Sequence, residues 1–474
     1  MPASAPRRLR ALLVSPLLIL VLLVGSVAAA KPLTSRQLNR DRLLSFILRQ
    51  QLVMDHYSHK LIDDHLSEAA FGLYLKQLDA RKRFLLQSDV DELTAYKDRI
   101  DDEIYQGRMK LPVVSAQIMA RRIPVVRKMV SGLLTQKFDF DRHESLQTDP
   151  AKLAYCKDSA ELRERWRKVL KFQVINRYLD LKEDQAAGDK KAKKASDEEL
   201  RQQARKKVQA SLNDLFDRMS EETEQDYFDR YFDAIARAFD PHTDYFPPEQ
   251  KEDFDISMRG SLEGIGATLR EEDGYVKVVG IIPGGPAARQ GQLQPEDTIL
   301  KVAQGKGEPV EITGISLRDA VNLIRGKKGT LVKLTVRRPD GRRLVIPIVR
   351  DVVQIEETFV KSTTVTDPKN KKAFGYVMIP SFYRDFKHIQ EGKGGRNVTD
   401  DVRRALEKLK AKKISGLIID LRNDGGGALT DAVSVAGLFI KTGPVVQVRS
   451  SDGSIRVLSD KDPSIEYGGP LIVL

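Results

Sequence analysis

The chain has 474 residues, of which 41% are hydrophobic and 31% are charged, with a net charge of +12. This length is enough for roughly two to four domains of ~100–200 residues, and the composition indicates a soluble protein with buried cores. A single cysteine, Cys156, excludes an intramolecular disulfide.

The N-terminus has the order of a secretory signal peptide. Three arginines between positions 7 and 10 precede an apolar run over 11–24, and small residues follow up to Ala30. This basic, apolar and A-x-A order predicts a signal peptide over 1–30 with cleavage after Ala30; an uncleaved membrane anchor is the alternative. Export without disulfides favours a bacterial periplasm, with membrane association peripheral at most, because no other segment approaches the ~20 apolar residues of a span.

Residues 34–238 have the apolar spacing of helices, and we assign 31–250 to an N-terminal helical domain. The highly charged stretch 182–209 predicts a long exposed helix or a mobile arm. Basic runs at 190–194 and 205–207 account for part of the charge excess. No aromatic residues interleave with them and export argues against a nucleic-acid partner, so we interpret them as solvated helix faces.

Two groups of side chains have the residue types of metal ligands: His56, His59 and His65, and Asp240, His242 and Asp244. No cysteine or carboxylate cluster at a recognisable spacing completes the first group. The second group lies where three prolines end the helical pattern, and a rigid turn with Asp and Thr bonded to their own backbone is the preferred interpretation. We therefore expect no metal site.

The apolar period becomes strand-like between residues 257 and 351, and we assign 251–352 to one small domain. Strands are predicted over 275–282, 298–302, 331–336 and 343–348, with an amphipathic helix over 317–324. Together they predict a partly open sheet capped by one helix.

This order of elements resembles a PDZ domain. The segment Ser261 to Gly266 is similar to the carboxylate-binding loop of that family, and Pro283 to Ala288 followed by Asp297 and Ile299 matches a second family pattern. Glycines there let consecutive N–H groups converge on a terminal carboxylate, and the strand that follows offers its edge to a peptide. A generic glycine turn in a small barrel is the alternative. The predicted binding residues are Leu262, Gly264, Ile265, Gly266, Val321 and Ile324.

The last segment, 353–474, alternates strands and helices. We predict strands over 374–379, 416–421, 445–449 and 470–474, a helix capped by Thr399, and an apolar helix over 429–440. The strand 416–421 lacks polar alternation, which is typical of a sheet buried on both faces. The predicted fold class of the whole chain is therefore multidomain α+β, ending in part of an α/β layer.

Three glycines, Gly425 to Gly427, stand between the strand 416–421 and the next helix. Such a loop presents backbone N–H groups to negative charge, either a phosphate or the oxyanion of an acyl transfer. The phosphate interpretation requires G-x-G-x-x-G or a following G-K-[ST], and neither is present. We favour an oxyanion hole with Gly425 and Gly426 as donors.

From residue 40 onward the chain resembles the carboxyl-terminal-processing serine peptidases. The matching motifs are YLKQLD at 74–79, AFDPHT at 238–243, SLEGIGA at 261–267, GGPAA at 284–288, IPSFY at 379–383, LIIDLR at 417–422, GGGALT at 425–430 and GLFI at 437–440. The resemblance implies a ClpP/crotonase-like protease domain and an endopeptidase that captures protein C-termini in its PDZ groove. It further implies cleavage by a Ser–Lys dyad whose neutral Lys is the general base, with no cofactor. The implied partners are envelope or periplasmic proteins with apolar C-terminal tails, together with an adaptor protein.

The resemblance places the nucleophile and the lysine beyond Leu474, so we expect the chain to be a fragment and assign it no catalytic nucleophile. A truncated gene product is the lesser alternative. Ser381 and Ser434 do not lie on a nucleophile elbow, and His388 has no recognisable triad partner. Two other hypotheses remain: a module that binds C-termini without cutting them, and a nucleotide-binding α/β protein.

Overall fold

The computed structural model describes residues 35–187, 195–272, 274–313, 315–390, 392 and 394–474. The chain divides into two compact units, Met1–Tyr245 and Phe246–Leu474, and each is described here by itself. The predicted signal peptide and the basic run 190–194 lie outside the described residues. Across the described ranges, no helix combines the length and the apolar character that a membrane crossing requires.

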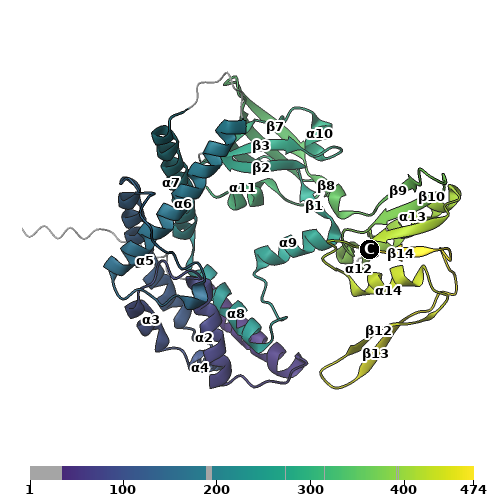
Figure 1. Cartoon of the computed structure of the whole chain (residues 1–474). Coiled ribbons are helices and arrows are strands. Elements are labelled where there is room, and N and C mark those ends of the chain that lie inside the picture. Colours follow the sequence, from purple (N-terminus) through teal and green to yellow (C-terminus); the bar gives the residue numbers. More distant parts are fainter. Residues whose placement is uncertain (1–34, 188–194, 273, 314, 391, 393) are drawn as a thin grey trace, which may run out of the picture. The chain divides into compact units, whose positions relative to one another are not determined.

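The first unit is helical, as its sequence predicts (Figure 1). Its α-helices are α1 (Ser35–Gln50), α2 (Asp64–Leu78), α3 (Gln87–Thr94), α4 (Ile100–Gln106), α5 (Leu111–Leu134), α6 (Ser159–Ala187), α7 (Asp197–Glu221) and α8 (Glu224–Phe239). Helix α8 buries an apolar stripe that includes Phe228, Tyr231 and Ile235, and it packs against α2 and α5. Burial of such a stripe, at roughly 25 cal/mol per Å² of apolar surface, is what holds these helices together.

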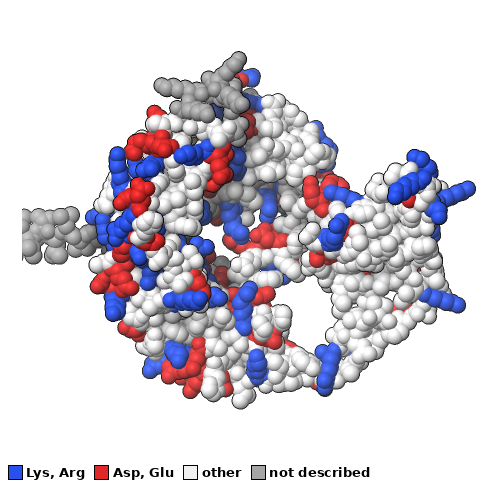
Figure 2. All heavy atoms as spheres, viewed as in Figure 1, with Lys and Arg blue, Asp and Glu red and all other residues white. Residues whose placement is uncertain are grey.

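In its described part the charged stretch 182–209 is mostly helical, which is one of the two predicted alternatives, but it is not exposed on every face. Ser196 begins α7 with a capping box, and its side chain accepts a hydrogen bond from the N–H of Glu199. Leu200, Ala204 and Val208 then follow at helical spacing, and all three are buried. The predicted exposure was wrong here because a narrow stripe of apolar residues is enough to dock a helix whose other faces are charged. Figure 2 shows those charges as a mixture of both signs over the surface of the helical unit.

The second unit begins with α9 (Pro248–Arg259), which ends at Gly260 with φ +65°. A six-stranded antiparallel sheet follows, with five of its strands in the order β2-β3-β4-β6-β7. Its strands are β2 (Ala267–Glu272), β3 (Tyr275–Ile281), β4 (Thr298–Gln304), β6 (Leu331–Arg337) and β7 (Arg343–Val349), with β5 (Val310–Glu311) paired to β4. Helices α10 (Pro286–Gln290) and α11 (Leu317–Ile324) complete this layer, and Ala320 and Ile324 of α11 are buried in its core.

A short two-stranded sheet leads out of this domain. Strand β1 (Ser261–Gly264) pairs antiparallel with β8 (Asp351–Gln354), which places Leu262 opposite Val353. The loop that follows β1 therefore lies between this small sheet and β2. Gly260, directly before β1, is closely packed against Phe359. A Cβ at this position would lie only 2.7 Å from the Phe359 ring.

The last part of the second unit is a mixed sheet in the order β14-β11-β10-β9. Strand β11 (Gly416–Asp420) pairs parallel with β10 (Ala373–Met378) and with β14 (Leu471–Val473), while β9 (Lys361–Thr366) is antiparallel to β10. The other elements are α12 (Phe386–Gln390), α13 (Val398–Ala411), α14 (Leu429–Gly437) and the hairpin β12 (Gly443–Arg449) and β13 (Ile455–Asp460). The predicted multidomain α+β class is confirmed.

Two predicted helix ends differ from the structure. The cap of α13 is Asn397, whose side chain accepts the N–H of Asp400, and Thr399 lies inside the helix. The predicted cap failed because Thr399 uses its hydroxyl elsewhere, donating to Asp431 at 2.7 Å. Helix α14 ends at Gly437, whereas the apolar pattern predicted an end at 440.

Candidate functional site

The glycine loop lies between the carboxyl end of β11 and the start of α14. Its backbone is joined to the segment after β10, because the N–H of Phe382 donates to Gly426 O at 2.9 Å and the N–H of Ala428 donates to Phe382 O at 2.8 Å. All three glycines are exposed to solvent. Loops at the carboxyl ends of parallel strands are where open α/β sheets bind their ligands, and this one projects backbone N–H groups there.

The three glycines are needed for different reasons. A Cβ on Gly427 would lie 2.3 Å from Phe382 O, so a side chain cannot fit against that backbone. Gly426 has φ +91° in open space, a conformation that other residues rarely adopt. Gly425 shows neither restriction. The loop is therefore shaped by close approach at one glycine and by backbone conformation at another.

One of the two predicted oxyanion donors is occupied in this structure. The N–H of Gly426 donates to Asp424 Oδ1 at 2.6 Å, whereas the N–H of Gly425 has no acceptor among the described residues. Burial raises the pKa of Asp424, whose Oδ2 is buried without a hydrogen-bond partner. Sequence reasoning missed this role of Asp424, although an Asp two residues before a loop N–H is the usual signal of an Asx turn.

A charged cluster fixes the end of β11 that precedes the loop. The buried Asp420 accepts hydrogen bonds from the Arg422 guanidinium and from the hydroxyl of Tyr376 on β10. Arg422 first, and Tyr376 second, hold the pKa of Asp420 well below its usual range. The carboxylate therefore stays charged and anchors the strand end on both sides.

A second carboxylate fixes the helix that follows the loop. Asp431, in the first turn of α14, is buried and accepts from Arg384 Nη1 at 2.8 Å and from the hydroxyl of Thr399. An acid at this place also interacts favourably with the amino end of the helix. Asp431 thus links the start of α14 to the segment that carries Arg384 and to α13.

The serines and the histidine considered in the sequence do not form a catalytic set here. Ser434 Oγ donates to Thr430 O at 3.0 Å, and Ser381 Oγ is buried without a partner. His388 Nδ1 lies 2.6 Å from Asp385 Oδ2, a partner that the sequence did not reveal. Among the described residues, no serine Oγ is hydrogen-bonded to a lysine Nζ or to His388.

The predicted carboxylate loop presents free donors. The N–H groups of Ile265 and Gly266 have no acceptor among the described residues, while their carbonyls accept from Ala287 and Ile282. Gly266 has φ +73°, and a Cβ there would lie 3.2 Å from Gly285. The close packing against Gly285 holds these two donors in place.

The strand and helix beside this loop form a potential groove. Strand β2 has β3 as its single neighbour in the sheet, so its other edge is unpaired, and α11 packs against β2. Val321 is half-buried and lines a cavity of about 640 Å³ between α9 and α11. Ile265 and Ile324 are 3% and 2% exposed, so they belong to the domain core and can form only the floor of a groove.

Two further residues lie close to Gly264. Its Cβ position would meet Leu262 at 3.2 Å and the side chain of Arg325 at 3.7 Å. Arg325 has no carboxylate nearer than 3.9 Å, and the sequence analysis did not single it out. The Arg325 atom near Gly264 is Cγ, and the nearest carboxylates to its guanidinium are Glu252 and Asp253 of α9.

The candidate metal ligands serve other purposes. Asp240 Oδ1 accepts the N–H of His242, which is the predicted turn, and Asp244 pairs with Arg237 at 2.8 Å. His56 Nε2 lies 2.9 Å from Thr243 Oγ1. No group of three His, Cys, Asp or Glu side chains in the described ranges is placed to hold a metal ion.

Three domain families match the chain. The tail specific protease N-terminal domain matches residues 48–249, the PDZ domain matches 254–337, and peptidase family S41 matches 373–474. These matches follow one another along the chain without overlap. The glycine loop lies within the third match and the free donors of Ile265 and Gly266 within the second.

Individual proteins are similar over long stretches. The tail-specific protease of Haemophilus influenzae is 35% identical over 426 residues, which cover 90% of this chain and 57% of that protein. The carboxy-terminal processing protease CtpA of Bacillus subtilis is 32% identical over 55% of this chain and 53% of its own length. A solved PDZ domain of a Vibrio cholerae carboxy-terminal protease in complex with peptide is 43% identical, covering 20% of this chain and 98% of that chain with a TM-score of 0.20. The chain thus spans little more than half the length of the Haemophilus influenzae and Bacillus subtilis proteases.

Proposed function

We propose, given that this chain belongs to the carboxyl-terminal-processing serine peptidases, that it captures the C-terminal tails of proteins and presents them to a serine endopeptidase site. The substrates are proteins with free, apolar C-termini. An exported, periplasmic location fits the N-terminal sequence, and an adaptor protein is a further proposed partner.

The observation that carries this proposal is the set of free donors beside an unpaired strand edge. The N–H groups of Ile265 and Gly266 point to no acceptor of the described chain, and the aliphatic stem of Arg325 lies near Gly264. An extended peptide on the edge of β2 would complete main-chain hydrogen bonds and bring its terminal carboxylate to these groups. Val321 would contact the apolar side chains, above the floor formed by Ile265 and Ile324.

For the cleavage step we propose that the glycine loop supplies the oxyanion donors. Gly425 is available, and Gly426 becomes available when its N–H leaves Asp424. The nucleophilic serine and the basic lysine are proposed to follow Leu474. In this arrangement a removed donor is expected to cost roughly 10²–10³ in kcat, the usual effect for an oxyanion hole.

Calorimetric titration tests the tail-binding site directly. We expect a peptide with an apolar C-terminus to bind, and amidation of that C-terminus to weaken binding at least about tenfold, because the amide removes the charge that the loop N–H groups recognise. Unchanged affinity of the amidated peptide would overturn the assignment of residues 262–266.

A matched pair of variants makes the same test from the protein side. Gly266→Ala places a side chain against Gly285 at φ +73°, whereas Gly274→Ala has a nearly identical φ of +74° and open space around it. Both variants place alanine at the same positive φ, but we expect only Gly266→Ala to lower the affinity for the peptide. Equal losses in the two variants would mean that the loop has no special role.

A module that binds C-termini without cutting them is the second candidate. The observation in its favour is that neither Ser381 nor Ser434 is hydrogen-bonded to a lysine Nζ in the part of the chain that the structure describes. It shares the binding step, so the titration supports both candidates and a cleavage assay separates them.

A further inference from the structure

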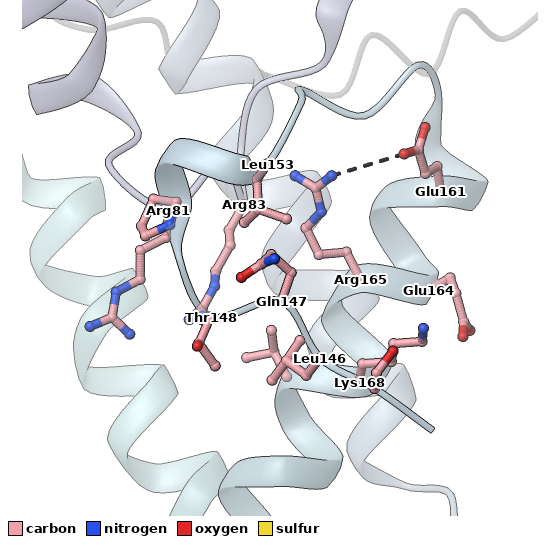
Figure 3. Close-up of a pocket in the computed structure, with 13 residues that line it drawn as sticks. Arg81, Arg83, Leu146, Gln147, Thr148, Leu153, Glu161, Glu164, Arg165 and Lys168 are labelled. Carbon is pink, nitrogen blue, oxygen red and sulfur yellow. Dashed lines mark ion pairs between the residues drawn. The ribbon is translucent and has the colours of Figure 1, made fainter. Parts of the chain in front are cut away.

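A basic pocket lies in the helical unit, apart from the glycine loop and the PDZ groove. It has a volume of about 230 Å³ and is lined by α6, by the segment before α3 and by the loop 145–153 (Figure 3). This volume is below the ~300–1,000 Å³ of sites for drug-sized ligands. The pocket is therefore suited to a compact group.

The charged side chains around the pocket do not neutralise one another. Four cations line it, Arg81, Arg83, Arg165 and Lys168, against two carboxylates, Glu161 and Glu164, which leaves two positive charges. Glu164 is committed to Arg167 at 2.7 Å, outside the pocket. Glu161 accepts the N–H of Lys157 and reaches Arg165 only at 3.9 Å, the pair drawn as a dashed line in Figure 3.

Three of the cations have no carboxylate partner. Among the described residues, no ion pair or side-chain hydrogen bond is formed by Arg81, Arg83 or Lys168. Arg165 differs, because its guanidinium donates to Lys82 O and Ala154 O and so joins two segments of the wall. The unpaired cations are therefore available to a ligand, and Arg165 holds the pocket together.

The backbone of Arg83 is clamped, which presents its side chain in one direction. Its N–H donates to Asp79 Oδ1 at 2.8 Å, and its carbonyl accepts from Trp166 Nε1 at 2.7 Å. The guanidinium lies 5.7 Å from the centre of the Trp166 ring. Burial, and then the charge of Arg81, lowers the pKa of Arg83, and the nearby charge of Asp79 offsets this only in part.

Neutral donors complete the wall. Gln147 Oε1 accepts the N–H of Asp149, which leaves its NH2 group as a donor, and the hydroxyls of Ser145 and Thr148 also line the pocket. An anion with several acceptor oxygens can use all of these groups. A phosphate carries about −1.5 to −2 charge at neutral pH and three strong acceptor oxygens, whereas one carboxylate would leave a positive charge uncompensated.

We propose that this pocket binds a phosphate group, held by Arg83 with Gln147 as a neutral donor, while Arg81 and Lys168 contribute positive charge from opposite sides of the pocket (Figure 3). The group belongs either to a free phosphate or to the headgroup of an anionic phospholipid, since both present the same oxygens. The site is independent of peptide binding and of peptide cleavage.

The fluorescence of Trp166 provides a direct test, because it is the single tryptophan of the chain and contacts Arg83. We expect inorganic phosphate to change this fluorescence saturably, and Arg83→Gln to weaken binding at least about tenfold. Lys168→Gln is a second variant, which remains informative if Arg83→Gln fails to fold. Arg163→Gln is the matched control, because Arg163 is an exposed cation of α6 that does not line the pocket.

Co-sedimentation with phosphatidylglycerol vesicles, against phosphatidylcholine vesicles, distinguishes the two sources. Binding of phosphatidylglycerol without binding of inorganic phosphate, lost in Lys168→Gln and kept in Arg163→Gln, supports the lipid headgroup. The proposal is overturned if neither probe binds, or if Arg163→Gln weakens binding as much as the pocket variants do.

Discussion

Two carboxylates of the helical unit, Asp41 and Asp229, share the side-chain amide of Gln225. The amide nitrogen lies 3.1 Å from Asp229 and 3.4 Å from Asp41. The hydrogen bond of Gln225 and the charge of Arg40 both lower the pKa of Asp229, but by less than burial raises it. Burial, with the charges of Asp226 and Asp41 adding to it, raises the pKa of Asp229 to about 6. The native fold therefore favours the protonated form of this side chain.

This raised pKa predicts how stability depends on pH. The pKa of Asp229 in the folded state lies above the unfolded value of 3.8. Its contribution to the free energy of unfolding is therefore most favourable below about pH 4 and is lost as the pH rises through 6. We expect Asp229→Asn to raise the free energy of unfolding at pH 7 by about 1–2 kcal/mol and to change it little at pH 4. Denaturation followed by Trp166 fluorescence measures both values.

The control for that experiment is Glu221→Gln, which removes one negative charge from an exposed position at the end of α7. A similar stabilisation in both variants would attribute the effect to net charge. A stabilisation by Asp229→Asn that persists at pH 4 would contradict the raised pKa.

At the scale of elements, contacts with the segment after β10 determine the backbone conformation of the loop between β11 and α14. The hydrogen bonds of Phe382 to Gly426 and Ala428 make this loop a continuation of the sheet. The three glycines therefore differ in their tolerance of a side chain, although their sequence is a plain repeat. An alanine series separates them.

We expect Gly427→Ala to be the most harmful of the series, at more than about 2 kcal/mol, because its Cβ would overlap Phe382 O. Gly426→Ala should cost about 1–2 kcal/mol from its positive φ alone. Gly425→Ala should be neutral or slightly stabilising. Hydrogen exchange of peptides that cover β10, β11 and the loop measures the order, and equal effects at the three positions would contradict it.

At the scale of the whole molecule, the described residues form three separate hydrophobic cores. One core lies in the helical unit, and two lie in the second unit, under the PDZ sheet and under the last sheet. Ile265, which carries one of the free donors, belongs to the second core, and the glycine loop follows β11, whose Leu417 and Ile419 belong to the third. Binding and cleavage are therefore assigned to different layers of the same unit.

This division predicts that binding and cleavage can be separated. We expect residues 1–474 to bind an apolar-tailed peptide without releasing a product, and a chain that extends past Leu474 to cleave a reporter with the same tail. Chromatography of the peptide after incubation measures both. Cleavage by residues 1–474 alone would contradict our assignment of the nucleophile, and a continuation without a suitable serine and lysine would leave the binding module as the better proposal.

Local patterns made much of the fold predictable. Apolar spacing indicated the helices before residue 238, and turn residues indicated the strands of the PDZ sheet, because helix and strand periods are properties of neighbouring residues. The ends were less predictable: Asn397 caps α13 since Thr399 is engaged by Asp431 on another element. The exposure of the stretch 182–209 was predicted wrongly for a similar reason. Most of its residues are charged, and the few apolar side chains of α7 that are buried pack against other elements.

Residue types in their linear order were enough to predict the fold class, the family and the position of the glycines. The tertiary structure decided which groups are free to act. Asp424 occupies the N–H of Gly426, and the N–H groups of Ile265 and Gly266 remain open. It also brought Arg83 and Lys168 together across 85 residues of chain to line one pocket. Hydrogen bonds and unpaired charges depend on distances in space, and no linear pattern specifies those distances.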